Sequence, residues 1–191
     1  MVRKSLGAVY TPELLADWVA SELLGRLQHV KSPLVIDPAC GDGALLKSVL
    51  RTKSHFSIAV AGIDIDPGAI RQAKRTLPTG TLLKVADALQ PGGRGSDVGS
   101  GWTGLIDAKR IAGVISNPPW GAGLEQNAPE LRGAGYQLAQ GQFDSYELFI
   151  ELCLKVMPDH AILAFIIPDS LFLPEHRALR TLLLGNLCAG A

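Results

Sequence analysis

Short apolar runs that are rich in β-branched residues recur along the chain, with longer amphipathic stretches between most of them. Each run has the length of a strand and is apolar at nearly every position, which is typical of strands buried on both faces of a parallel sheet. The pattern predicts five such strands, at residues 34–36, 58–63, 81–85, 111–115 and 161–167.

The stretch before the first run predicts a helix with Thr11 as its N-cap and Pro12 in its first turn. A threonine hydroxyl can accept a free backbone N–H there, and proline lacks the N–H that a first turn leaves unpaired. Apolar residues at helical spacing mark one face of this helix, namely Leu14, Leu15, Trp18, Val19, Leu23, Leu24 and Leu27.

Later stretches also have helical spacing. Asp144 and Glu147 have the separation of a capping box, and the apolar positions behind them end at Pro158. Helices alternating with strands indicate an α/β fold with a doubly wound, mostly parallel sheet, whose ligands bind beyond the carboxyl ends of the strands. These helices are predicted at 44–50, from 66 onward, at 144–157 and at 174–184.

The first strand is followed by Asp-Pro-Ala-Cys-Gly-Asp-Gly at residues 37–43. Gly41 and Gly43 allow a tight turn and close approach of a ligand to the backbone. A dinucleotide fold would have a third glycine at the position of Leu46, and the two carboxylates disfavour a pyrophosphate. They suit a cationic ligand, such as the ammonium and sulfonium groups of S-adenosylmethionine. The alternative is an ordinary strand-to-helix turn capped by Asp42.

Two further carboxylates follow the second and third strands. Asp64 lies about twenty residues beyond the glycine turn, a separation at which an acidic residue can accept ribose hydroxyls. Asp87 could accept from the exocyclic amine of an adenine. Each of them, taken alone, is also compatible with a solvated carboxylate at a strand end.

The fourth strand ends in Asn117-Pro118-Pro119-Trp120. Each proline restricts the residue before it, so the turn is rigid. The Pro118 carbonyl and the Asn117 side-chain oxygen would form a pair of fixed acceptors for an amine on a planar ring, and Trp120 would stack on that ring. The alternative is a rigid turn whose tryptophan fills a core.

Composition limits the partners. The chain of 191 residues suits one domain, and its 18 basic and 18 acidic residues balance, so binding to a nucleic acid would depend on a local patch. The three cysteines, Cys40, Cys153 and Cys188, are widely spaced, which argues against a disulfide framework and against a zinc site. No apolar run is long enough to span a bilayer, so we expect a cytoplasmic protein. The glycine-rich stretch at 91–104 is assigned no function.

Seven motifs in this order resemble the gamma-type adenine-N6 DNA methyltransferases of restriction-modification and phage-defence systems, over about residues 3–185. They are LGAVYTP at 6–12, DPACGDG at 37–43, GIDIDP at 62–67, AD at 86–87, NPPW at 117–120, FDSYELF at 143–149 and IIPDSLF at 166–172. The resemblance implies a class I, Rossmann-like methyltransferase fold with S-adenosylmethionine as cofactor and no metal.

The resemblance also implies roles for individual residues. Thr11 and the turn at 37–43 would hold the methionine part of the cofactor, Asp64 its ribose, and Asp87 its adenine amine. Ile65 and Phe149 would lie against the adenine. Asn117, Pro118, Pro119 and Trp120 would be catalytic and hold a flipped adenine of double-stranded DNA. The complete implied cofactor set is Tyr10, Thr11, Pro12, Asp37, Ala39, Cys40, Gly41, Gly43, Asp64, Ile65, Asp87, Ala88, Asn117 and Phe149.

In the family a further strand pair and a DNA-recognition domain follow, and this sequence contains neither. We therefore expect residues 1–191 to be one catalytic, cofactor-binding domain that belongs to a longer enzyme or acts with a partner subunit.

Two other functions remain open. Protein-glutamine N5 methyltransferases also use an NPP-aromatic turn, although a helical substrate domain precedes their cofactor domain. A non-catalytic S-adenosylmethionine-binding subunit of a larger complex is the second. A cytosine-C5 enzyme is disfavoured, because it would need a nucleophilic thiol beside the base and Cys40 lies in the cofactor turn.

Overall fold

A single parallel sheet lies at the centre of the computed structural model, which describes residues 11–52, 57–89, 106–121 and 123–188. Its strands run in the order β3-β2-β1-β4-β5, and every pairing is parallel. This confirms the predicted α/β fold with a doubly wound sheet. The strands are β1 (Leu34–Asp37), β2 (Ala59–Asp64), β3 (Leu82–Val85), β4 (Ile111–Ser116) and β5 (Ile162–Phe165).

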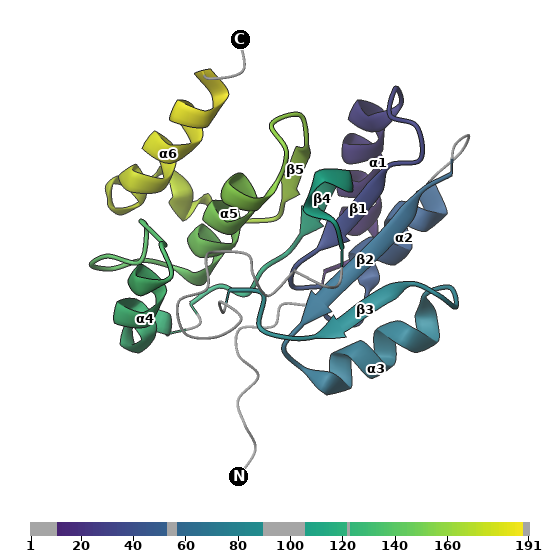
Figure 1. Cartoon of the computed structure of the whole chain (residues 1–191), viewed down its shortest axis with the longest axis horizontal. Coiled ribbons are helices and arrows are strands. Elements are labelled where there is room, and N and C mark those ends of the chain that lie inside the picture. The colour runs from purple at the N-terminus through teal and green to yellow at the C-terminus, as the bar shows by residue number, and fades with distance from the viewer. Residues whose placement is uncertain (1–10, 53–56, 90–105, 122, 189–191) are drawn as a thin grey trace.

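Helices cover both faces of this sheet (Figure 1). The first three along the chain lie on one side of the sheet and the last three on the other. The α-helices are α1 (Glu13–Leu27), α2 (Ala44–Thr52), α3 (Pro67–Thr76), α4 (Ala128–Gly133), α5 (Ser145–Val156) and α6 (Arg177–Cys188). Short 3-10 turns are η2 (Ala108–Arg110), η3 (Leu124–Asn127), η4 (Asp169–Phe172) and η5 (Pro174–His176).

Alternation along the strands divides the core into two halves. In β1, Leu34 and Ile36 belong to the cluster that includes α5, whereas Val35 belongs to the cluster that includes α1 and α2. Successive side chains of a strand point to opposite faces, so a strand that is apolar at every position feeds both clusters. The continuous apolar runs of the sequence have this cause.

The direction of winding reverses at the centre of the sheet. From β1 the chain proceeds to β2 and β3 on one side, and then returns to place β4 and β5 on the other. In sheets of this kind the crevice beyond the carboxyl ends of the two central strands binds ligands. Here those strands are β1 and β4, which end at Asp37 and Ser116.

The start of α1 differs from the prediction. The helix begins at Glu13, with Pro12 at the N-cap position, and the Thr11 hydroxyl accepts a hydrogen bond from Asn117 instead of from the helix. Leu14 and Trp18 are exposed, at 86% and 62%, because the buried face of α1 is centred on Ala16 and Ala20. The predicted apolar face was wrong at these two positions.

The predicted capping box of α5 is confirmed. Asp144 is the N-cap, and its backbone N–H donates to Glu147 Oε1 at 2.8 Å. The helix ends at Val156, directly before Met157 and Pro158. Its position matters for the site, because its first turn faces the segment that follows β4.

Gly62 in β2 marks a close approach between the sheet and the turn after β1. A Cβ atom at this position would lie 2.7 Å from Cys40 Sγ and 3.0 Å from Leu46 Cδ1. Only glycine leaves room there for the buried thiol. The Cys40 backbone N–H also donates to the Ile63 carbonyl at 2.9 Å, so the turn is seated directly on β2.

Smaller differences concern the ends of elements. Strand β5 is shorter than the predicted 161–167, and the predicted helix at 174–184 is a 3-10 turn followed by α6. Helix α4 was not predicted. The predictions for Tyr10, the stretch at 91–104 and part of the motif at 6–12 fall outside the described residues. Among the described helices, none is long and apolar enough to cross a membrane.

Candidate functional site

The ends of β1 and β4 are joined by a buried hydrogen bond. Asp37 closes β1 and is 1% exposed, and its Oδ1 accepts from the Ser116 hydroxyl at 2.8 Å and from the Ala39 N–H at 3.0 Å. Ser116 is the last residue of β4 and is itself buried. The pair therefore fixes the point from which the turn at 117–120 leaves the sheet.

The electrostatic state of this carboxyl is unusual. Burial raises the pKa of Asp37 to about 7, while its hydrogen bonds with Ala39 and Ser116 act against the rise and the charge of Asp64 adds to it. A buried carboxylate beside a second carboxylate stabilises a cation placed near it. This environment fits a positively charged ligand and disfavours a phosphate.

Asp64 organises the second wall of the site. Its Oδ2 accepts from the Gly41 N–H at 2.7 Å, and its Oδ1 accepts from the Asp66 N–H at 2.8 Å. Asp64 thus links the end of β2 to the glycine turn after β1. Each carboxylate oxygen has two lone pairs, so acceptor capacity remains for a further donor.

The turn after β1 is open on its outer side. Gly41 has a φ of 54°, in the left-handed region, and a Cβ atom there would meet nothing within 4 Å. A ligand can therefore approach the backbone at this point. Burial, together with the neighbouring charges of Asp37 and Asp64, raises the pKa of the Cys40 thiol, which argues against a thiolate nucleophile.

Apolar and polar groups continue along the edge toward β3. Ile65 follows Asp64 and is 56% exposed, so its side chain is accessible to a ligand. Asp87 follows β3, and its Oδ1 accepts from the Leu89 N–H at 3.0 Å. Ala88 and Phe149 are buried in the same apolar cluster, at 4% and 6% exposed.

The turn after β4 is anchored to the N-terminal part of the chain. The Asn117 side-chain nitrogen donates to Thr11 Oγ1 at 2.9 Å, across 106 positions of sequence. Thr11 is 7% exposed and Pro12 is exposed at the start of α1. The structure therefore brings together Thr11 and Asn117, two residues of the predicted site. Their spacing in the sequence could not reveal that they are in contact.

The rest of the turn packs against α5. Pro118 is buried, and Trp120 is partly buried against the cluster that contains α5. The Ser145 hydroxyl donates to the Pro119 carbonyl at 2.5 Å, and the Gly121 N–H donates to Asp144 Oδ1 at 2.8 Å. Both contacts come from the first residues of α5 or its cap.

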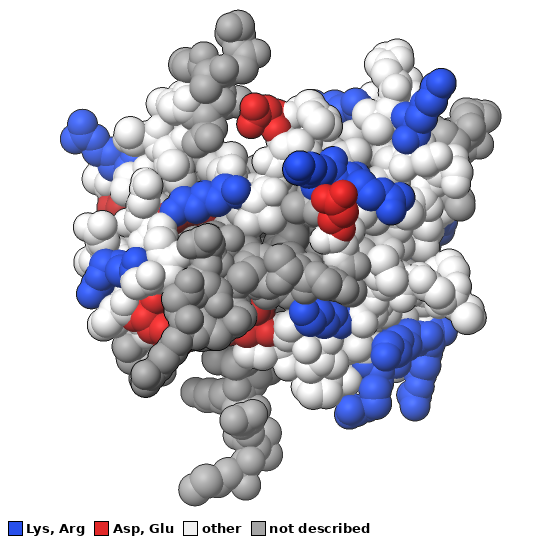
Figure 2. Space-filling model, viewed as in Figure 1, with Lys and Arg blue, Asp and Glu red and all other residues white. Residues whose placement is uncertain are grey.

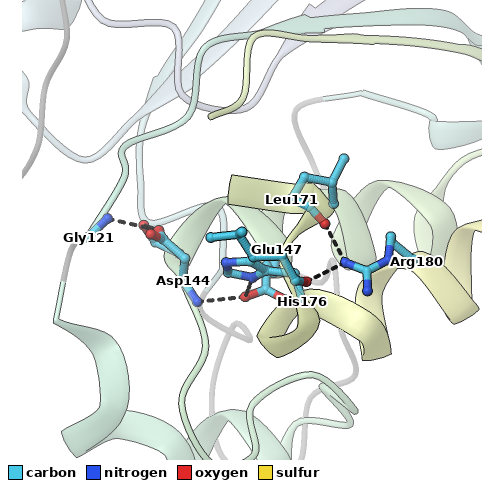
Figure 3. A network of polar contacts seen from close by, with 8 residues as sticks. Gly121, Asp144, Glu147, Leu171, His176 and Arg180 are labelled. Atoms are coloured by element: carbon cyan, nitrogen blue, oxygen red, sulfur yellow. Dashed lines mark hydrogen bonds and ion pairs between the residues drawn. The ribbon is translucent and has the colours of Figure 1, made fainter. Parts of the chain in front are cut away.

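A pocket of about 300 Å³ opens beside this turn. The network drawn in Figure 3 runs along it: Asp144 lies between Gly121 and Glu147, and Glu147 Oε1 lies 3.0 Å from His176 Nδ1. The turn after β4 is thereby connected to η5, which follows β5. The lining residues are Gly121, Gly123, Gln142, Phe143, Asp144, Glu175 and His176.

Sequence reasoning missed three residues that hold the site together. Ser116 could have been noticed as a polar residue inside a buried apolar strand. Asp144 was interpreted as part of the capping box and Ser145 only as part of the motif at 143–149, and no pattern indicated that they also contact the segment after β4. Among the described residues, no three potential ligands lie close enough to hold a metal ion.

Residues 106–188 match a family model described as the Eco57I restriction-modification methylase. The chain is 30% identical over 178 residues to the type II methyltransferase M.BanIII of Aneurinibacillus aneurinilyticus, covering 82% of this chain and 29% of that protein. It is 27% identical to the type II methyltransferase M.TthHB8I of Thermus thermophilus, covering 94% and 39%. The chain thus spans less than half the length of these relatives.

Solved structures agree on the fold. A type I restriction-modification methyltransferase subunit from Streptococcus thermophilus superposes with a TM-score of 0.70 at 17% identity, covering 94% of this chain and 39% of that one. A Listeria monocytogenes protein, provisionally assigned as a class I S-adenosylmethionine-dependent methyltransferase, gives 0.67 at 23% identity, covering 95% and 53%. The fold is that of class I methyltransferases, as predicted.

These comparisons confirm the predicted resemblance to restriction-modification methyltransferases. Fold and family match together support S-adenosylmethionine as the cofactor.

Proposed function

We propose that this chain transfers a methyl group from S-adenosylmethionine to the N6 amine of an adenine that is flipped out of double-stranded DNA. The enzyme would act in the cytoplasm as part of a restriction-modification or phage-defence system. The observation that carries the proposal is the convergence of Asp37, Asp64 and Asn117 at the carboxyl ends of β1, β2 and β4.

The residues at this edge fit the proposed cofactor. Asp64 and the ionised form of Asp37 provide negative potential for its ammonium and sulfonium groups, and the open backbone at Gly41 admits its methionine part. Asp64 has acceptor capacity for ribose hydroxyls, and the exposed Ile65 side chain offers an apolar contact for an adenine. Bound there, S-adenosylmethionine supplies an electrophilic methyl group.

We assign Thr11, Asp87, Ala88 and Phe149 to the same site in a supporting role. Thr11 holds Asn117, and Asp87 follows β3 at a position where it could accept from the amine of the cofactor adenine. Phe149 and Ala88 form the buried floor beneath that edge. Tyr10, Pro12, Ala39, Cys40 and Gly43 complete the proposed set on the resemblance alone.

The turn at 117–120 would activate the target amine. The lone pair of an exocyclic amine is delocalised into its ring, so the nitrogen becomes nucleophilic only when its hydrogens are held and it moves toward tetrahedral geometry. Fixed acceptors at Asn117 and Pro118 would stabilise the positive charge that develops on the nitrogen. Trp120 would stack on the ring, and no ionised general base is required.

Affinity for DNA is expected to come from outside these residues. Basic side chains on the face shown in Figure 2 are spread over several elements, with a group near α3, which carries Arg71, Lys74 and Arg75. The whole chain has a formal net charge of zero. We therefore propose that a recognition region of a longer protein, or a partner subunit, supplies the positive charge that duplex binding needs.

Methyl transfer from labelled S-adenosylmethionine tests the proposal, with the complete protein or assembly and with adenine-containing duplexes as acceptors. The chain should label adenine N6, and Asn117→Ala should abolish labelling while cofactor binding is retained. Asn127→Ala, at the start of α4, is the matched control and should label normally. Labelling of a glutamine-containing peptide instead of DNA would establish the glutamine alternative, and equal rates for Asn117→Ala and wild type would refute the role of the turn.

A further inference from the structure

The backbone on both sides of Trp120 is held by two residues at the start of α5. We infer that Asp144 and Ser145 are positioning residues that fix the orientation of the Trp120 ring. The orientation itself is a property of the chain, whereas its consequence for methyl transfer rests on the proposed function.

The two contacts act on the two peptide groups that flank Trp120. The Ser145 hydroxyl binds the Pro119 carbonyl at 2.5 Å, which belongs to the peptide before Trp120. Asp144 Oδ1 accepts the Gly121 N–H at 2.8 Å, which belongs to the peptide after it. Rotation of the first peptide plane is φ of Trp120 and rotation of the second is ψ, so the two bonds together restrict both angles. The direction of the Cα–Cβ bond follows.

The single Ser145 hydroxyl proton has two acceptors within reach. The Pro119 carbonyl lies at 2.5 Å and Asp144 Oδ1 at 3.1 Å, and one proton serves one of them at full strength. The shorter contact is to Pro119. Asp144 Oδ1 then accepts from the Gly121 N–H, so Ser145 binds the peptide before Trp120 and Asp144 binds the peptide after it.

The indole has no polar anchor of its own among the described residues. Trp120 Nε1 is buried and makes no hydrogen bond there, although the nitrogen of a buried tryptophan usually finds a partner. The ring is therefore placed by its backbone and by packing against the apolar cluster. Loss of either backbone contact should therefore change the orientation or the mobility of the ring.

Asp144 is itself braced. Its N–H donates to Glu147 Oε1, and the same oxygen lies 3.0 Å from His176 Nδ1 in η5 (Figure 3). Glu147 is 3% exposed. The contacts of Asp144 and Ser145 with the backbone beside Trp120 are thus supported by His176, from the segment that follows β5.

The test uses a chain in which Trp120 is the sole tryptophan, with Trp18 and Trp102 replaced by phenylalanine. In this background Ser145→Ala removes the donor and Ser145→Thr retains it. Thr81→Ala is the matched control, because the Thr81 hydroxyl also donates to a proline carbonyl, that of Pro78 at 2.7 Å, at the opposite edge of the sheet.

The Trp120 indole is either held in its packed orientation or released from it. We expect the ratio of the held to the released population to fall by about fivefold in Ser145→Ala, since one hydrogen bond is lost. Acrylamide quenching should rise and fluorescence anisotropy should fall, with Ser145→Thr and Thr81→Ala close to the parent. Unchanged quenching in folded Ser145→Ala would overturn the inference.

A second variant separates positioning from helix capping. Asp144→Ser keeps a good N-cap residue for α5 but removes the carboxylate that binds Gly121. It should release the indole as Ser145→Ala does, with the circular dichroism of the parent. If it folds and the indole stays held, the inference is wrong, whatever the behaviour of Ser145→Ala.

Enzyme kinetics distinguishes a positioning role of Ser145 from a role in stability alone. In the complete protein Ser145→Ala should lower kcat, leave KM for S-adenosylmethionine unchanged, and recover in Ser145→Thr. Failure of the chain to bind S-adenosylmethionine would refute the proposed function and leave the fluorescence result standing. A normal kcat with a released indole would show that Trp120 orientation does not serve catalysis.

Discussion

Replacement of Asp37 by asparagine should change how stability depends on pH. The carboxyl is 1% exposed, and its Oδ1 accepts from both Ala39 and Ser116. Asparagine has nearly the same shape and keeps an oxygen for these two donors, so Asp37→Asn removes the titration with little change in packing.

The size of the effect follows from the shift. Burial raises the pKa of Asp37 from 3.8 to about 7. Between these values the folded protein binds more protons than the unfolded chain, so the free energy of unfolding falls as pH rises. A shift of about three units corresponds to about 4 kcal/mol. The loss should begin near pH 4 and level off above about pH 7.

Urea unfolding of wild type and Asp37→Asn from about pH 4 to about pH 8 measures this difference. Asp37→Asn should be the more stable protein at high pH, by up to about 4 kcal/mol relative to the difference at low pH. Parallel stability profiles for the two proteins would refute the reasoning, because Asp37 would then have the same pKa in the folded and unfolded chain.

Three other substitutions test packing and the site. Gly62→Ala places a Cβ atom 2.7 Å from Cys40 Sγ and should cost about 2 kcal/mol of unfolding free energy, which urea titration would detect; full stability would contradict the close approach. Glu151 accepts the backbone N–H groups of Gln137 and Leu138, at 2.6 and 2.8 Å. Glu151→Gln places an amide donor against one of these N–H groups, so it should lower the free energy of unfolding by about 2 kcal/mol, measured by thermal unfolding at constant pH. Unchanged stability would mean that the two N–H groups find other acceptors. Ile65→Ala should weaken S-adenosylmethionine binding by about tenfold in calorimetry. The control is Leu82→Ala at the other end of the strands, where the side chain is 47% exposed against 56% for Ile65, and it should not weaken binding. Equal effects of the two substitutions would remove Ile65 from the site.

The fold could be predicted because its determinants are local. Strands that are buried on both faces must be apolar at every position, and the glycine turn and capping box are defined by short spacings. Asp37 and Asp64 could be assigned to one edge, since the ends of parallel strands meet there. The all-parallel pairing that the structure shows is the consequence.

Contacts between distant segments could not be predicted in the same way. Thr11 was expected to cap a helix because that choice is available locally, but its hydroxyl binds Asn117 instead. Leu14 and Trp18 were assigned to the buried face by spacing alone, whereas the residues that face α2 and the sheet decide which stripe of α1 is buried. Local preference loses in both cases to the packing of the whole fold.

The turn after β4 could be predicted in part. Its rigidity is a property of Pro118 and Pro119, and this could be inferred from the sequence. The position of the Trp120 ring depends on Asp144 and Ser145, which follow it by more than twenty positions in the chain. The stacking role of Trp120 stays a prediction.

Titration calorimetry of S-adenosylmethionine into the folded chain tests the central claim most directly. We predict one site per chain, also filled by the demethylated product. The affinity should fall by about tenfold or more in Asp64→Asn, because a charged acceptor is lost, and should be unchanged in Asp159→Asn, an exposed aspartate beyond α5. Binding of neither compound by well-folded protein, or equal affinities for Asp64→Asn and wild type, would contradict the account.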